Sequence, residues 1–285
     1  MNKLIIHDDD LQRWALQKAN ELNLPNFKAS RKWLDKFKKS QRIVSRKITK
    51  FVSSDYVEKQ EEIENMALSF VHEAKEMFVD YDPNEVCNTD QSGFNKELHS
   101  GRSLEIADTK QIQKRVQSVS ATTHSYTIQP TITAGGKLLS PLYLVLQEKN
   151  GTFGPKVEQH LKTFTPTNIK LEASKSGKVG KRHVTKWFVE VYSKNVPEKS
   201  LLLLDALPTH KDINLNASTN NELSVIIDTS KTTGLVQPLD AFFFRTWKNF
   251  VRKISYKILL DGLDIKLLQR DNIISCAHAV LCSEI

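Results

Sequence analysis

The sequence predicts an α/β domain preceded by a small all-helical module. Four consecutive leucines at 201–204 form a short apolar run, typical of a strand buried on both faces. Other strand-like runs and amphipathic segments with a helical period alternate between residues 85 and 254, which is the pattern of an α/β fold. The first 50 residues instead show two short helical patterns. We therefore expect a helical module at 1–52, a connecting helix at 53–82 and the α/β domain at 83–285.

Composition excludes several classes of protein. The chain has 285 residues, 39% of them hydrophobic and 26% charged, as in soluble globular proteins with a proper core. No run approaches the roughly 18 apolar residues of a membrane span, so a membrane partner is not expected. Three cysteines are too few and too scattered for a disulfide framework, which favours a reducing compartment. No motif predicts a small-molecule substrate.

Positive charge is concentrated near the start of the chain. The formal net charge is +8, yet the segment from Lys28 to Lys50 holds ten Lys or Arg residues against one acid, Asp35. The remainder is therefore close to neutral. A concentrated positive charge in an ordered segment indicates a polyanionic partner.

The helical module has the outline of a helix-turn-helix. The acids at 8–10 can cap a first helix, and Leu11, Trp14, Ala15, Ala19 and Leu22 fall on one face of it. After a break at 24–26, Ser30 is a good N-cap for a second helix that buries Trp33, Leu34 and Phe37. The alternative is a solvated amphipathic helix pair, but the basic residues that follow favour phosphate contacts. The candidate DNA-contacting residues are Arg31, Lys32, Lys36, Lys38, Lys39, Arg42, Arg46 and Lys47.

The α/β part can be divided into elements from its patterns. A helix at 55–78 carries an apolar stripe, which predicts packing on a sheet; a partner helix is the alternative. Strand-like runs at 125–132 and 137–147 flank Gly135-Gly136, a hairpin signal, and Pro130 places the first run at a sheet edge or at a bulge. The basic segment 174–182 reads as a flexible loop. The remaining predicted elements are a strand at 85–88, a helix around 184–191, strands at 201–204 and 223–227, and a helix from Pro238 onward.

Three aspartates stand at comparable places in this pattern. Asp90 follows one strand, Asp205 ends the leucine strand, and Asp240 opens the last long helix. Carboxylate oxygens from rigid elements suit Mg²⁺ or Mn²⁺, and two such ions about 4 Å apart would serve an in-line phosphoryl displacement. The alternative for each residue alone is a solvated acid at the end of a strand or helix.

Several blocks of the sequence resemble a known family. FKASRKWLDKFKKSQRIVSRKITKF (27–51) is similar to the second helix-turn-helix of centromere-protein-B-type DNA-binding domains, as carried by pogo/Tigger transposases. The blocks VCNTDQSGF (86–94), THSYTIQPTITAGGKLLSPLYLVLQE (123–148), SKSGKV (174–179), LLLLDALPTHKD (201–212) and TTGLVQPLDAFFFRTWKNFVRKI (232–254) resemble the pogo/Tigger-type DDE transposase domain, in the family's order.

The resemblance implies a ribonuclease H-like, mixed-sheet catalytic domain at 83–285, with Asp90, Asp205 and Asp240 as its catalytic and metal-binding triad. It implies two Mg²⁺ or Mn²⁺ ions, double-stranded DNA as partner, metal-dependent DNA cleavage and strand transfer, and a place in the nucleus. A homodimer is left open. Relatives extend further at both ends and differ at Ala206-Leu207, so the alternative is a catalytically inactive, domesticated or degenerate DNA-binding protein.

Overall fold

The structure is a computed structural model, and it divides into two compact units, Met1–Ile63 and Glu64–Ile285. It describes residues 6–45, 59–95, 98, 124–205, 222–227, 237–267 and 269–282. The division falls inside the predicted connecting helix at 53–82. No helix in these described ranges is long and apolar enough to cross a membrane.

The first unit holds the two predicted helices, α1 (Asp8–Glu21) and α2 (Arg31–Ser40). Ser30 caps α2 as expected, its hydroxyl accepting a hydrogen bond from the backbone N–H of Trp33. The cap of α1 is His7, not one of the three aspartates, and Asp10 accepts the His7 N–H at 2.9 Å. The predicted apolar face of α1 is only partly covered, because Ala19 is its one buried residue and Trp14 is 48% exposed.

The second unit is built on a mixed sheet of the kind that the sequence predicts. Its strands form two hydrogen-bonded ladders, ordered β4-β1-β7-β8 and β2-β3-β5-β6. β7 pairs in parallel with both β1 and β8, whereas β3 pairs antiparallel with both β2 and β5. The strands are β1 (Val86–Thr89), β2 (Ser92–Asn95), β3 (His124–Gln129), β4 (Thr131–Thr133), β5 (Leu142–Gln147), β6 (Ile169–Ser174), β7 (Lys199–Leu204) and β8 (Glu222–Ile227).

The two ladders keep one common register. Thr89 pairs with Thr131 in one ladder, and Ser92 pairs with Ile128 in the other. From the first pair to the second, each strand advances by three residues in opposite directions, so the register is the same. β1 and β2 are thus two halves of one strand, and β3 and β4 are two halves of its neighbour. The interruption lies at Asp90 and Pro130, since proline has no N–H to donate to the ladder. Pro130 lies between β3, which is interior to its ladder, and β4, which ends the other ladder, so the predicted edge position holds for β4 and not for β3.

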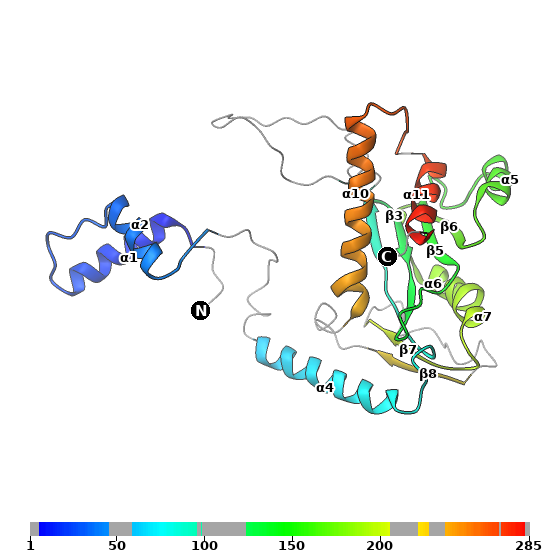
Figure 1. Cartoon of the computed structure of the whole chain (residues 1–285), viewed down its shortest axis with the longest axis horizontal. Coiled ribbons are helices and arrows are strands. Elements are labelled where there is room, and N and C mark those ends of the chain that lie inside the picture. Colours follow the sequence, from blue (N-terminus) through cyan, green and yellow to red (C-terminus); the bar gives the residue numbers. More distant parts are fainter. Residues whose placement is uncertain are drawn as a thin grey trace. The chain divides into compact units, whose positions relative to one another are not determined.

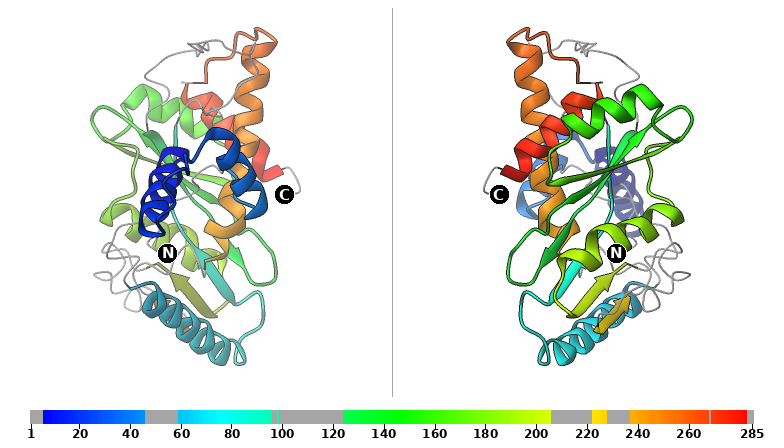
Figure 2. Two further views of the ribbon diagram at one scale, coloured as in Figure 1. Left: turned by 90° about the vertical axis from the view of Figure 1, so that its left-hand side faces the viewer. Right: turned by 90° about the vertical axis from the view of Figure 1, so that its right-hand side faces the viewer.

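Helices cover both faces of the sheet (Figures 1 and 2). One face, here called the α10 face, packs against α5 (Pro155–Phe164), α10 (Phe244–Leu260) and α11 (Arg270–Cys282), with Trp247 at the centre. On the same face, α4 (Gln60–Phe78) covers Val86 and Leu201. The opposite α6 face packs against α6 (Lys181–Trp187), the π-helix η2 (Phe188–Tyr192) and the short α7 (Ser193–Asn195).

Most predicted elements are present, and α4 packs on the sheet as its apolar stripe indicated. The elements β2, α5, β6 and α11 were missed. The last three had local signals. Pro155 stands at the first turn of α5, β6 alternates apolar and polar residues, and the buried residues of α11 recur with a helical period. The predicted turn at 232–234 lies outside the described residues.

Candidate active site and DNA-binding surfaces

Asp90 and Asp205 are neighbours at the ends of two parallel strands. Asn88 on β1 pairs with Leu203 on β7. Asp90 lies two residues after Asn88, and Asp205 lies two residues after Leu203. Side chains alternate along a strand, so both carboxylates share the α10 face with Val86 and Leu201. Both residues are nearly buried, Asp90 at 6% and Asp205 at 8% exposure. The structure therefore brings together two acids that are 115 positions apart.

Asp240 reaches the same face from a helix. It lies in the π-helix η4 (Leu239–Phe243), which continues into α10 and is anchored by the buried Leu239. Asp240 is exposed, yet the pKa of its carboxyl is raised, mainly because the group is partly desolvated. The positive charge of Lys248 opposes this increase, and the negative charge of Asp205 adds to it. Asp205 and Asp240 are thus within electrostatic reach of each other.

The donor set suits a hard divalent cation, but it is not a finished metal site. In the described ranges, no three Asp, Glu, His or Cys side chains are grouped closely enough to hold a metal ion. Two buried amides beside the aspartates have polar atoms without a hydrogen-bond partner: Asn88 Oδ1 on the same face, and both amide atoms of Gln237. Buried polar atoms without partners are rare and call for a ligand or water. Oxygen-only donors and these amides fit Mg²⁺ or Mn²⁺ with bound water.

The helical unit sorts the predicted DNA-contacting residues into two groups. Lys38 is largely covered and pairs with Asp8 at 2.8 Å, and Arg31 pairs with the other Asp8 oxygen at 2.9 Å. The hydrogen bond from Lys38, together with the charges of Lys38 and Arg31, lowers the pKa of Asp8. These two residues therefore join α1 to α2. Arg31 is nevertheless exposed, as are Lys32, Lys36, Lys39 and Arg42, while Arg46 and Lys47 lie outside the described residues.

The three exposed lysines of α2 are expected to carry phosphate contacts. Lys32, Lys36 and Lys39 follow one another at helical spacing, so they project from one side of α2. Replacing all three with Gln should make the negative slope of log affinity for duplex DNA against log salt shallower by about 2.7, at about 0.9 per lost contact. Fluorescence anisotropy at several NaCl concentrations measures this slope.

The matched control replaces three exposed lysines of the second unit, Lys149, Lys156 and Lys194, with Gln. This variant has the same net charge as the first. An equal loss of slope in both variants would show that total charge, and not the α2 surface, sets the salt dependence.

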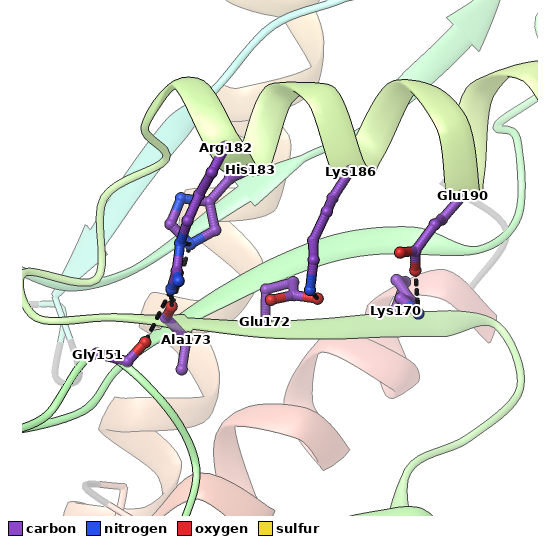
Figure 3. Close-up of polar contacts among 8 residues, drawn as sticks. All are labelled: Gly151, Lys170, Glu172, Ala173, Arg182, His183, Lys186 and Glu190. Atoms are coloured by element: carbon purple, nitrogen blue, oxygen red, sulfur yellow. Dashed lines mark hydrogen bonds and ion pairs between the residues drawn. The ribbon is translucent and has the colours of Figure 1, made fainter. Parts of the chain in front are cut away.

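The basic loop at 174–182 is held in place by hydrogen bonds, contrary to the flexible loop that was expected. Gly177 has a positive φ of 71° and its carbonyl accepts a bond from Thr127 Oγ1 at 2.7 Å. Arg182 donates to the carbonyls of Gly151 and Ala173, at 2.9 and 2.8 Å (Figure 3). Arg182 is therefore committed to the fold, while Lys175, Lys178 and Lys181 are exposed.

The hydrogen bonds of Arg182 also hold α6 and η2 next to β6, which is an edge strand of the sheet. Figure 3 shows two ion pairs between these elements, from Lys186 to Glu172 at 2.8 Å and from Lys170 to Glu190. Beside them, the buried His183 accepts the Gly180 N–H at Nδ1 and contacts the Ala173 carbonyl through Nε2. The bond from Gly180 requires a ring without a proton on Nδ1, because Nδ1 must accept.

Acid should weaken the second unit through His183. Burial lowers the pKa of this imidazole below its usual 6.5. The unfolded chain then binds more protons than the folded one, so stability rises with pH and is lost as the pH falls below about 6.5. His183→Asn, which keeps an acceptor, should flatten this dependence in denaturant unfolding between pH 5 and 8. His72→Gln on exposed α4 is the control, and equal pH slopes for His183→Asn and the unmodified chain would contradict the assignment.

Comparisons with known proteins agree with this architecture. Residues 129–273 match the model of the DDE superfamily endonucleases, and residues 6–47 match the Tc5 transposase DNA-binding domain. The first range includes Asp205 and Asp240 and begins after Asp90. A search of curated proteins found no match.

Solved structures of similar fold include transposase complexes. The Mos1 strand transfer complex is 11% identical with a TM-score of 0.50, and a Mos1 mariner paired end complex with Mn is 9% identical with a TM-score of 0.51. Each alignment covers 96% of this chain and 75% of the other. At this identity the likeness concerns the fold, a helix-turn-helix region and a ribonuclease H-like mixed-sheet domain.

Proposed function

Because the chain belongs to the DDE superfamily of endonucleases and carries a helix-turn-helix DNA-binding domain, we propose that it cuts DNA in a metal-dependent reaction at Asp90, Asp205 and Asp240. The observation that carries this proposal is the position of Asp90 and Asp205, each two residues beyond the paired Asn88 and Leu203 at the ends of adjacent parallel strands. Two nearly buried carboxyl groups on one sheet face offer oxygen ligands of the kind that a divalent cation binds.

Each part of the chain has a defined task in this reaction. Asp90 and Asp205 are fixed by the sheet, and Asp240 is brought to them by η4, so the three would hold two Mg²⁺ or Mn²⁺ ions. Bound there, such ions would lower the pKa of a water and stabilise the leaving oxygen. Asn88 and Gln237, whose buried amides have free polar atoms, would orient the waters around the aspartates.

The chemistry is two successive phosphoryl transfers. In the first, a water oxygen bonds to phosphorus at the end of a DNA element, and the bond to the 3′ oxygen breaks, leaving a 3′-hydroxyl and a 5′-phosphate. In the second, that 3′-hydroxyl attacks a phosphodiester of target DNA, so one P–O bond forms as another breaks. The substrate would be double-stranded DNA bound by α2. A protein with this substrate would act in the nucleus.

The second candidate function is a DNA-binding protein without catalysis. It is favoured by one observation, that the three aspartates are not gathered into a finished metal site in the described ranges. The residues Ala206 and Leu207, where relatives differ, lie outside those ranges.

A cleavage assay separates the two functions. Duplexes made from the genomic flanks of the coding sequence, and a supercoiled plasmid, are incubated with the full chain in Mg²⁺, Mn²⁺, Ca²⁺ or EDTA. We expect nicks that end in a 3′-hydroxyl with Mg²⁺ or Mn²⁺, and none with EDTA. DNA binding without cleavage under every condition would leave only the second candidate.

A further inference from the structure

The helix that follows Asp240 carries charge of a single sign. Between residues 241 and 260 the sequence contains five cations and no acid. The exposed face of an amphipathic helix usually carries both acidic and basic residues, since opposite charges one turn apart stabilise each other. The five cations are Arg245, Lys248, Arg252, Lys253 and Lys257.

Only one of these cations is neutralised by an acid within the described part of the chain. Lys257 pairs with Asp261 at 2.7 Å, at the far end of α10. Arg245, Lys248 and Arg252 form no ion pair there, and their spacing of three and four residues places them on one side of the helix. We name these three residues the α10 cationic stripe.

Two members of the stripe are held in position. The ammonium of Lys248 lies 5.5 Å from the ring centre of Phe94 and 6.0 Å from that of Phe244, so the half-buried side chain is oriented by cation–π contacts. Arg252 donates to Asn249 Oδ1 at 2.6 Å, and its Nε is buried without a partner. Fixed cations with unused donors are prepared to meet an anion at little entropic cost.

The stripe begins beside the candidate active site. Lysine side chains on a helix point back toward its N-terminus, and the charge of Lys248 is felt by Asp240, two turns earlier. From Arg245 to Arg252 the stripe spans about 10 Å of helix, at 1.5 Å per residue. Along one strand of duplex DNA, phosphates recur about every 3.4 Å of helix axis, so three cations over this length match a short run of phosphates.

We propose that the α10 cationic stripe is a second DNA-binding surface, which holds the phosphate backbone of duplex DNA next to the bond cut at Asp240. It rests on the proposed function for the identity of the ligand. It acts separately from α2, because the stripe belongs to the second unit and α2 to the first. An acidic protein segment is the competing partner, and it would leave DNA binding independent of the stripe.

The test measures binding of the full chain to a 30-base-pair duplex by anisotropy, in EDTA, at several NaCl concentrations. All variants carry Lys32→Gln, Lys36→Gln and Lys39→Gln, so that α2 contributes little. Adding Arg245→Gln and Arg252→Gln should make the negative log–log salt slope shallower by about 1.8. The control adds Lys149→Gln and Lys194→Gln, two exposed lysines elsewhere in the same unit, and should leave the slope unchanged.

Equal slopes for the stripe variant and its parent would overturn the proposal, as would an equal loss in the control. Circular dichroism of each variant verifies that α10 remains folded. Cleavage by the unmodified chain is scored separately in Mg²⁺. If the stripe variant changes the salt slope but the unmodified chain does not cleave DNA, this inference stands and the proposed nuclease activity is wrong. If the unmodified chain cleaves DNA but the stripe variant leaves the slope unchanged, the nuclease proposal stands and this inference is wrong.

Discussion

Asp205→Asn should abolish metal-dependent DNA cleavage, with a loss of about 10³-fold or more in rate, the scale seen when a group that stabilises transition-state charge is removed. The substitution keeps the shape of the side chain but removes the negative charge next to Asp90. Asp90→Asn should have the same effect, because the parallel register makes the two residues equivalent. Single-turnover nicking in Mg²⁺ and Mn²⁺ measures the rate.

Asp264→Asn is the matched control, since Asp264 is exposed and lies beyond α10. It should cleave at the unmodified rate, and all three variants should bind duplex DNA with unchanged salt dependence. If Asp205→Asn kept most of the activity, the aspartates would not be the catalytic group. Binding of Mn²⁺, followed by electron paramagnetic resonance, gives a readout that does not depend on turnover.

Trp247→Ala should destabilise the second unit by about 3–5 kcal/mol, the range for removing a large aromatic side chain from a packed core. Trp247 is 1% exposed and lies between the ring of Phe94 on β2, at 6.4 Å, and that of Phe243, at 5.6 Å. Because it fixes α10 to the sheet, its loss should also reduce cleavage by displacing Asp240. Urea unfolding monitored by far-UV circular dichroism measures the change.

The control for Trp247 is Phe242→Ala, five residues earlier and 76% exposed. Truncating an exposed aromatic ring leaves no cavity, so stability should change by less than about 0.5 kcal/mol. A loss of several kcal/mol in both variants would mean that aromatic content in this segment, and not burial of Trp247, supports the helix.

Local patterns were sufficient for much of the fold. The leucine run became β7, the stripe of 55–78 became α4 on the sheet, and Ser30 capped α2. The edge position predicted from Pro130 holds for β4, which ends its ladder, but not for β3 before it, which has a partner on each side. The α5, β6 and α11 elements have weaker patterns, and tertiary contacts complete them.

The candidate site shows the same division. The sequence predicted Asp90, Asp205 and Asp240 from their places at element ends, but with 33 acidic residues in the chain that choice also depended on family resemblance. The structure explains it by register, which puts Asp90 beside Asp205 on the face that η4 approaches. It also shows partners that the sequence did not indicate: Lys38 and the exposed Arg31 pair with Asp8, and Arg182 bonds to the carbonyl of Gly151.

The sequence by itself determined the residue chemistry and the periodicities: which segments are strands, which helix faces are apolar, and where positive charge is concentrated. These properties depend on residues a few positions apart. Only the tertiary structure decided which charges meet. The nearness of Asp90 to Asp205 and the ion pair of Lys38 with Asp8 arise from contacts between distant segments. The same holds for the α10 cationic stripe, which has no ion pair with an acid in the described part of the chain. Burial and distance in the folded chain set the energies of these interactions.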